Sequence, residues 1–147
     1  MIKKSVKEEI VGTWKLQSIF YKDAEGNKVD LYGENPNGIL MYDRLGYMNA
    51  QIGQKNRKKM SSAALTGDSD SEKVKAFDSF MAYYGKYYEK EPGEIIHEVE
   101  ACLIPNWEKQ DEIRYCEISG DTLYITTPIT VINNNETVIE VFWKRLI

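Results

Sequence analysis

The 147-residue sequence has little histidine, little cysteine and no long apolar run. One His cannot supply a metal site built from several imidazoles, and no metal is predicted. The two Cys, Cys102 and Cys116, form no CxxC motif and are expected to be reduced thiols, which favours a cytoplasmic protein. No apolar stretch approaches the length of about 18 residues that a membrane-spanning helix needs, so no membrane partner is expected.

Other absences restrict the class of function. The chain has 19 Lys and Arg against 23 Asp and Glu, a net charge of −4, and this acidic balance argues against a nucleic-acid partner. It contains no glycine-rich phosphate loop, no HExxH motif and no Ser-centred elbow, and no cofactor is predicted. Its first twelve residues are charged and lack the apolar segment of a secretory signal, which again favours a cytoplasmic location. The oligomeric state is left open, with a homodimer as one alternative.

Tyrosine is the abundant aromatic residue, with 10 Tyr against 4 Phe and 3 Trp. Tyr suits a cavity wall that is apolar but offers hydroxyl groups, although half-buried strands also favour Tyr. The length fits one domain, residues 1–147, with a core large enough to need no disulfide or metal.

Period-two alternation between turn residues predicts eight or nine strands. We expect them at residues 11–21, 28–32, 38–42, 47–52, 83–89, 94–103, 111–118, 122–127 and 137–146. In the first strand, one face is expected to carry Trp14, Leu16, Ser18 and Phe20. The short connections predict an all-β fold, an up-and-down antiparallel β-barrel of eight to ten strands. Residues 3–10 are expected to form a short lead-in, about one helical turn, at a barrel end.

One helix is predicted near residues 71–82. Ser69 and Glu72 form a capping box at its start. Apolar residues then follow at helical spacing, which predicts a face packed on the barrel: Val74, Phe77, Met81 and Tyr84. The polar segment before the helix, residues 53–70, is either a lid over the barrel or a disordered surface loop.

Three residues at the two ends of the chain are predicted to have a structural role. Gly12 and Trp14 form a Gly-x-Trp motif that opens the first strand. Arg145, near the end of the last strand, can stack its guanidinium group on the Trp14 indole, a cation–π contact worth about 0.5–2 kcal/mol. The two ends of the chain would then meet and close the sheet.

A series of motifs follows in order along nearly the whole chain. They are Gly12-Thr13-Trp14-Lys15-Leu16, Gly33-Glu34-Asn35-Pro36-x-Gly38-x-Leu40-Met41-Tyr42, Gly46-Tyr47-Met48, Tyr84-x-x-Tyr87, His97-x-Val99-Glu100, Pro105-Asn106-Trp107, Arg114-Tyr115 and Gly120-Asp121-x-Leu123. Together they resemble the bacterial and fungal lipocalin-like domain family. The resemblance implies a calycin-type β-barrel with an internal cavity. Most members of that family have no assigned activity, whereas some more distant lipocalin-fold proteins act as cyclases.

His97 is the sharpest candidate for chemistry, as a base. It lies between Ile95 and Val99 on the apolar face of its strand, which would face the barrel interior. A neutral imidazole there could exchange a proton near pH 7. The alternative is a core His hydrogen-bonded to a Tyr or to a backbone carbonyl.

Other residues are candidates for binding a ligand. Arg114 either faces solvent or faces the cavity, where it would need a partner; the resemblance favours the inward orientation. Asn106 and Trp107 follow a strand end, where they could contact a flat ligand or simply plug the rim. The tyrosines that could line the cavity include Tyr42, Tyr47, Tyr87 and Tyr124.

Three functions are consistent with the sequence. The leading hypothesis is a barrel that binds a small, largely apolar molecule, with a few polar groups fixing its orientation. The second is a cofactor-free cyclase or isomerase that uses His97 as base and Arg114 or a Tyr to stabilise developing charge. The third is an interaction module whose barrel is filled by its own side chains and has no cavity.

Overall fold

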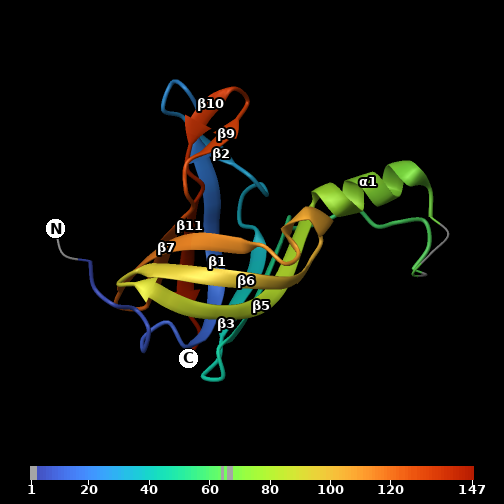
Figure 1. Ribbon diagram of the computed structural model, residues 1–147. Coiled ribbons are helices and arrows are strands. Elements are labelled where there is room, and N and C mark those ends of the chain that lie inside the picture. The colour runs from blue at the N-terminus through green and yellow to red at the C-terminus, as the bar shows by residue number, and fades with distance from the viewer. Residues whose placement is uncertain (1–2, 64, 66–67) are drawn as a thin grey trace.

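Strands dominate the structure, a computed structural model that describes residues 3–63, 65 and 68–147. The strands are β1 (Gly12–Lys22), β2 (Lys28–Asp30), β3 (Asn37–Tyr42), β4 (Tyr47–Gly53), β5 (Phe80–Glu91), β6 (Glu94–Cys102), β7 (Asp111–Ser119), β8 (Thr122–Thr126), β9 (Thr130–Ile132), β10 (Asn135–Thr137) and β11 (Glu140–Arg145). The helix α1 (Asp70–Asp78) lies between β4 and β5, and a 3₁₀ turn η1 (Pro105–Trp107) follows β6. Figure 1 shows α1 projecting away from the curved sheet.

In the described part of the chain, eight antiparallel strands close into a barrel. Their order is β11-β8-β7-β6-β5-β4-β3-β1, and β11 pairs with β1 to complete the ring. The short β2 adds to the end of β1, and β9 and β10 form a separate hairpin. The all-β, antiparallel barrel predicted from the sequence is therefore confirmed.

Most strand boundaries lie within two residues of the prediction, and the two larger differences have a physical reason. The expected strand at 83–89 begins earlier, at Phe80, because Phe80 pairs with Gly53 of β4. The expected strand at 137–146 is divided in two, since Thr137 pairs with Thr130 in the β9–β10 hairpin and β11 begins only at Glu140.

The first strand contains a bulge that its alternating pattern did not reveal. The register against β11 shifts between Leu16 and Ser18, which leaves Gln17 as an extra residue. The prediction that Ser18 and Phe20 share one face with Trp14 and Leu16 is therefore wrong. Ile19 turns toward the barrel interior instead, and Phe20 stacks on an aromatic ring of β11.

An indole and a guanidinium group fill one end of the barrel. Trp14 is fully buried, and its Nε1 donates a hydrogen bond to the Ile10 carbonyl at 2.9 Å. The Arg145 guanidinium lies 4.1 Å from the Trp14 ring centroid, the cation–π contact expected from the sequence, and Nη1 donates to the Val11 carbonyl at 3.0 Å. Gly12 has a φ of 139°, and a Cβ there would lie 2.9 Å from Arg145 Nη1, so this position requires glycine.

The N-terminal segment covers the same end. Ile10 and Val6 are buried, and the Ile10 amide donates to the Val6 carbonyl at 2.8 Å, which forms the single turn that the sequence predicted. The Val6 amide also donates to a Glu89 carboxylate oxygen at 2.8 Å. Side-chain and backbone contacts therefore tie this segment to the end of β5.

The helix is shorter and more exposed than predicted. Ser69 caps it, accepting from the Glu72 amide, but the helix ends at Asp78 rather than near residue 82, because the following residues pair with β4. None of its described residues is buried, and Val74 and Phe77 are 57% and 46% exposed. The expectation of a helical face packed on the barrel is therefore wrong.

The segment before the helix is attached to α1. Glu72 accepts hydrogen bonds from the amide and hydroxyl of Ser61, at 2.6 and 2.8 Å. Arg57 donates to the Ala76 carbonyl at 2.9 Å and lies over the Phe80 ring. Positions 64, 66 and 67 of this segment lie outside the described residues. No helix in the described ranges has the length and apolar character needed to cross a membrane.

Replacing Trp14 with Ala tests its role as the core residue of the closed end. We expect Trp14→Ala to lower the free energy of unfolding by about 3–5 kcal/mol, because the mutation removes a large buried ring. A urea titration followed by circular dichroism measures this loss, with half-buried Trp107→Ala as the matched control that should lose less. A loss below about 1 kcal/mol for Trp14→Ala would contradict the assigned role.

Candidate functional site

A cavity of about 620 Å³ lies inside the barrel. Much of its wall is apolar and comes from strands around the whole ring. The apolar lining includes Ile19, Leu31, Leu40, Ala50, Ile52, Met81, Ile104, Ile125, Ile139, Val141 and Trp143. Four polar or charged side chains from β5, β6 and β7 also line it: Tyr83, His97, Glu112 and Arg114. Tyr32, Asp78, Thr127 and Thr130 add polar groups elsewhere around it. The cavity is thus largely apolar, with a cluster of polar side chains on β5, β6 and β7.

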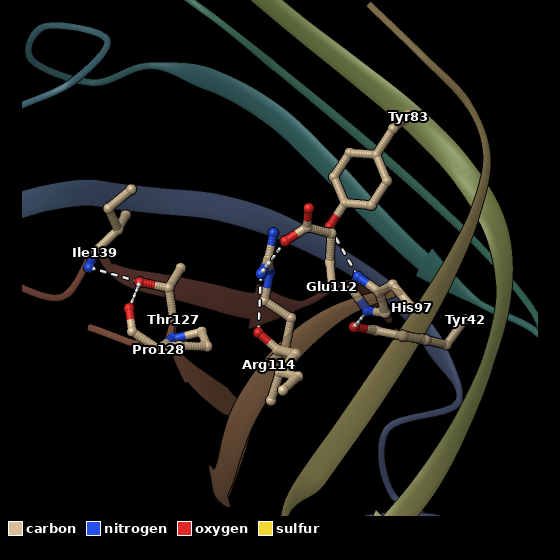
Figure 2. Close-up of polar contacts among 9 residues, drawn as sticks. Tyr42, Tyr83, His97, Glu112, Arg114, Thr127, Pro128 and Ile139 are labelled. Atoms are coloured by element: carbon tan, nitrogen blue, oxygen red, sulfur yellow. Dashed lines mark hydrogen bonds and ion pairs between the residues drawn. The ribbon is translucent and has the colours of Figure 1, made fainter. Parts of the chain in front are cut away.

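His97 lies between two tyrosine hydroxyl groups. Its Nε2 is 2.7 Å from the Tyr42 hydroxyl, and its Nδ1 is 2.8 Å from the Tyr83 hydroxyl. Figure 2 shows the imidazole bridging these two side chains. His97 is 1% exposed and Tyr42 is 2% exposed. Both ring nitrogens are therefore occupied, as in the alternative of a core His bonded to a Tyr.

The surroundings keep His97 neutral. Burial lowers the pKa of His97 well below its usual range, and the positive charge of Arg114 lowers it further. Burial also raises the pKa of Tyr42 and of Tyr83, so both phenols keep their protons at neutral pH. The three side chains form an uncharged hydrogen-bonded row at one side of the cavity.

Arg114 places a positive charge beside this row. It is 9% exposed, and its Nη1 donates to the Ile113 carbonyl at 2.9 Å and lies 3.5 Å from a carboxylate oxygen of Glu112. The guanidinium also lies 5.8 Å from the Trp107 ring centroid. Burial opposes the charged form of Arg114, but Tyr83 and Glu112 outweigh it and raise the Arg114 pKa. Figure 2 shows Tyr83, Glu112 and Arg114 pointing into the same region.

The structure brings together three of the eight residues predicted to contact a ligand. His97, Trp107 and Arg114 line the cavity. Tyr42 does not line it, because Tyr42 lies behind His97 in the core. Trp107 follows the end of β6 and packs edge-on against Tyr83, with centroids 5.7 Å apart.

The other four predicted residues lie away from the cavity. Tyr47 is 42% exposed, and Asn106 is exposed in η1. Tyr87 packs on Tyr42 and donates to the Asp43 carbonyl at 2.6 Å, in the β3–β4 turn. Tyr124 donates to Glu140 at 2.7 Å, and burial together with that carboxylate raises the pKa of Tyr124 to about 12.

The cavity residues that were not identified from the sequence include Tyr83, Glu112 and Trp143. Tyr83 was placed on a strand but on no particular face, and only its register opposite Cys102 turns it inward beside His97. Glu112 lies two residues before Arg114 on the same face of β7, and this spacing could have identified it as a cavity residue. Trp143 shares a face with the buried Val141, but its place in the cavity wall depends on the closed ring.

The chain matches the lipocalin-like domain family over residues 11–146. The match covers nearly all of the chain and spans every strand of the barrel. This chain therefore belongs to the lipocalin-like domain family. No curated protein matches it significantly in sequence.

Replacing His97 with Gln tests whether the buried imidazole is neutral. The unfolded chain binds a proton at His97 near pH 6.5, whereas the folded protein resists that proton until lower pH. The unfolded state thus binds more protons below about pH 6.5, and stability that is complete above this pH falls as the pH drops. The wild type should therefore lose more unfolding free energy on acidification than His97→Gln, by up to about 1.4 kcal/mol per pH unit.

Urea titrations of both proteins across this pH range measure the difference. Titration of carboxylates affects both proteins alike and cancels in the comparison. Parallel curves for the two proteins would contradict a neutral, buried His97.

Proposed function

We propose that this lipocalin-like chain binds a small, largely apolar molecule inside its barrel. The observation that supports this function is the cavity of about 620 Å³, whose lining is largely apolar and carries a cluster of polar side chains on β5, β6 and β7. Ligand sites are typically concave spaces of about 300–1,000 Å³ with this composition. Burial of apolar ligand surface would supply the affinity, at about 25 cal/mol per Å².

The polar wall would fix the orientation of the ligand. Trp107 packs against both Tyr83 and the Arg114 guanidinium, and all three side chains line the cavity. A ligand with a polar end would place that end at this group and its apolar body among the aliphatic residues. A barrel filled by its own side chains would leave no space of this size, which argues against the interaction module.

The cyclase hypothesis meets an obstacle at His97. A base needs a free ring nitrogen near the substrate, but both nitrogens of His97 are already bonded to tyrosine hydroxyls. Its lowered pKa also makes it a weak base. Binding is therefore the better-supported proposal. The cytoplasmic location, the absence of a nucleic-acid partner and the homodimer stay predictions.

Filling the cavity tests the proposal. Ile52 lines the cavity, so Ile52→Trp should place an indole in the ligand space and reduce binding by about 10-fold or more. Native and denaturing mass spectrometry of the purified protein would detect a retained small molecule, and titration with 1-anilinonaphthalene-8-sulfonate would measure access to the cavity.

The matched control is Val131→Trp, on the exposed β9–β10 hairpin, where Val131 is 64% exposed. This variant should bind like the wild type. Equal dye affinity in Ile52→Trp, Val131→Trp and the wild type, with no retained molecule in any of them, would contradict an interior binding site.

A further inference from the structure

We propose that the ligand is an amphipathic monocarboxylate that carries a second oxygen acceptor, a keto oxygen, toward the far end of its apolar body. This inference rests on the proposed function, binding inside the barrel, and adds the chemical class of the ligand. Three hydrogen-bond donors of the cavity wall support it: the guanidinium of Arg114, the hydroxyl of Tyr83 and the indole N–H of Trp143.

Trp143 has a buried donor with no acceptor. Its Nε1 is the one buried side-chain nitrogen or oxygen in the described residues that lacks a hydrogen-bond partner. Trp143 is 3% exposed and lines the cavity. A buried donor without an acceptor loses its hydrogen bond to water and gains none in return, so native structures rarely keep one. An acceptor on a bound molecule would pair this N–H.

The hydrogen-bond pattern around His97 leaves the Tyr83 hydroxyl hydrogen free. The Tyr42 hydroxyl is buried, and its hydrogen-bond partner is His97 Nε2, so this hydroxyl must donate to avoid an unpaired hydrogen. Nε2 then accepts, and the neutral imidazole carries its proton on Nδ1. Nδ1 donates to the Tyr83 oxygen, and the Tyr83 hydrogen is left to point elsewhere. Since Tyr83 lines the cavity, this hydrogen is available to a ligand.

Arg114 has donors to spare at the same place. Its hydrogen bond to a backbone carbonyl and its ion pair with Glu112 both use Nη1. Glu112 approaches at 3.5 Å and is more exposed than Arg114, with side-chain exposures of 26% and 11%. This single contact leaves Nε and Nη2 for Tyr83 and a ligand. A guanidinium fork matches the two oxygens of a carboxylate, and the Tyr83 hydroxyl adds a third donor.

The sheet register places Trp143 and Arg114, which would bind the two acceptors of the ligand, at different positions on the barrel wall. Trp143 pairs with Leu123, and Leu123 pairs with Ile118 on β7, four residues along that strand from Arg114. At about 3.3 Å per residue this is roughly 13 Å along the barrel wall, with two strand spacings around it. These backbone positions lie on strands that are not neighbours in the ring, since β8 stands between β7 and β11. We therefore assign the carboxylate and the second acceptor to different parts of the ligand.

Four probes of similar size test the proposal by isothermal titration calorimetry. They are decanoate, methyl decanoate, a keto-decanoate with its keto group near the far end, and its isomer with the keto group near the carboxylate. We expect decanoate to bind about 10–100-fold more tightly than its methyl ester, as expected for a charge-assisted pair. The far-end keto acid should bind about 2–10-fold more tightly than decanoate, and the near-end isomer should not.

Two variants test whether Arg114 and Trp143 are the donors responsible for these differences in affinity. Arg114→Gln should remove the preference for decanoate over the ester, while the exposed Arg44→Gln keeps it as the matched control. Trp143→Phe keeps an aromatic ring without the N–H, so it should remove the preference for the far-end keto acid over decanoate. Comparing two ligands within each variant cancels general effects on folding or cavity size.

The outcomes distinguish a wrong ligand class from a wrong binding function. If methyl decanoate binds as tightly as decanoate, or Arg114→Gln keeps the preference, the carboxylate assignment is wrong while the binding function stands. If the far-end keto acid gains nothing, or keeps its gain in Trp143→Phe, the second acceptor is wrong. If no probe binds the folded wild-type protein and the dye does not enter it, the proposed function itself fails.

Discussion

Closure of the sheet through the pairing of β1 with β11 is the constraint on which the rest of the molecule depends. Once the ring of eight strands is closed, each inward position faces a space of fixed width. At one end, the Trp14 indole fills that space, with the Arg145 guanidinium stacked on it and the N-terminal turn packed below. The hollow part of the barrel exists because its inward positions carry shorter aliphatic side chains, which do not reach across the ring.

The polar wall of the cavity shows how the barrel accommodates groups that are costly to bury. A charged imidazole beside Arg114 would be repelled and poorly solvated, so His97 stays neutral and meets two phenols instead. Arg114 keeps its charge because Glu112, a backbone carbonyl and the Tyr83 oxygen surround it. The same arrangement that makes His97 a poor base leaves donors directed toward the cavity. This wall is therefore better suited to holding an oxygen atom than to removing a proton.

The sequence predicted the barrel well because strand alternation and turn residues are local signals. The sequence predicted strand faces and the end of the helix less well where pairing with a strand distant in the sequence decided them. The bulge at Gln17 reverses the faces of Ser18 and Phe20, and nothing within that strand signals it. The helix ends early because Phe80 finds a partner in β4, which overrides its helical spacing. In the site, period two identified His97, but the predicted tyrosines included the exposed Tyr47 and left out Tyr83, because only the strand register shows which tyrosines face the cavity.

The core and the candidate site share residues, and this overlap links stability to binding. Trp143, Leu40 and Val141 belong to the buried core cluster and also line the cavity. In the closed half of the barrel, the core is complete, since Trp14 has both its apolar contacts and its hydrogen bond. In the hollow half, the aliphatic surfaces line the cavity and the Trp143 N–H has no acceptor among the described residues. A bound molecule would supply the missing apolar contacts and the missing acceptor together. On the proposed function, the cavity is an incomplete core, and a ligand that completed it would be apolar along its length and carry oxygen where the wall presents donors.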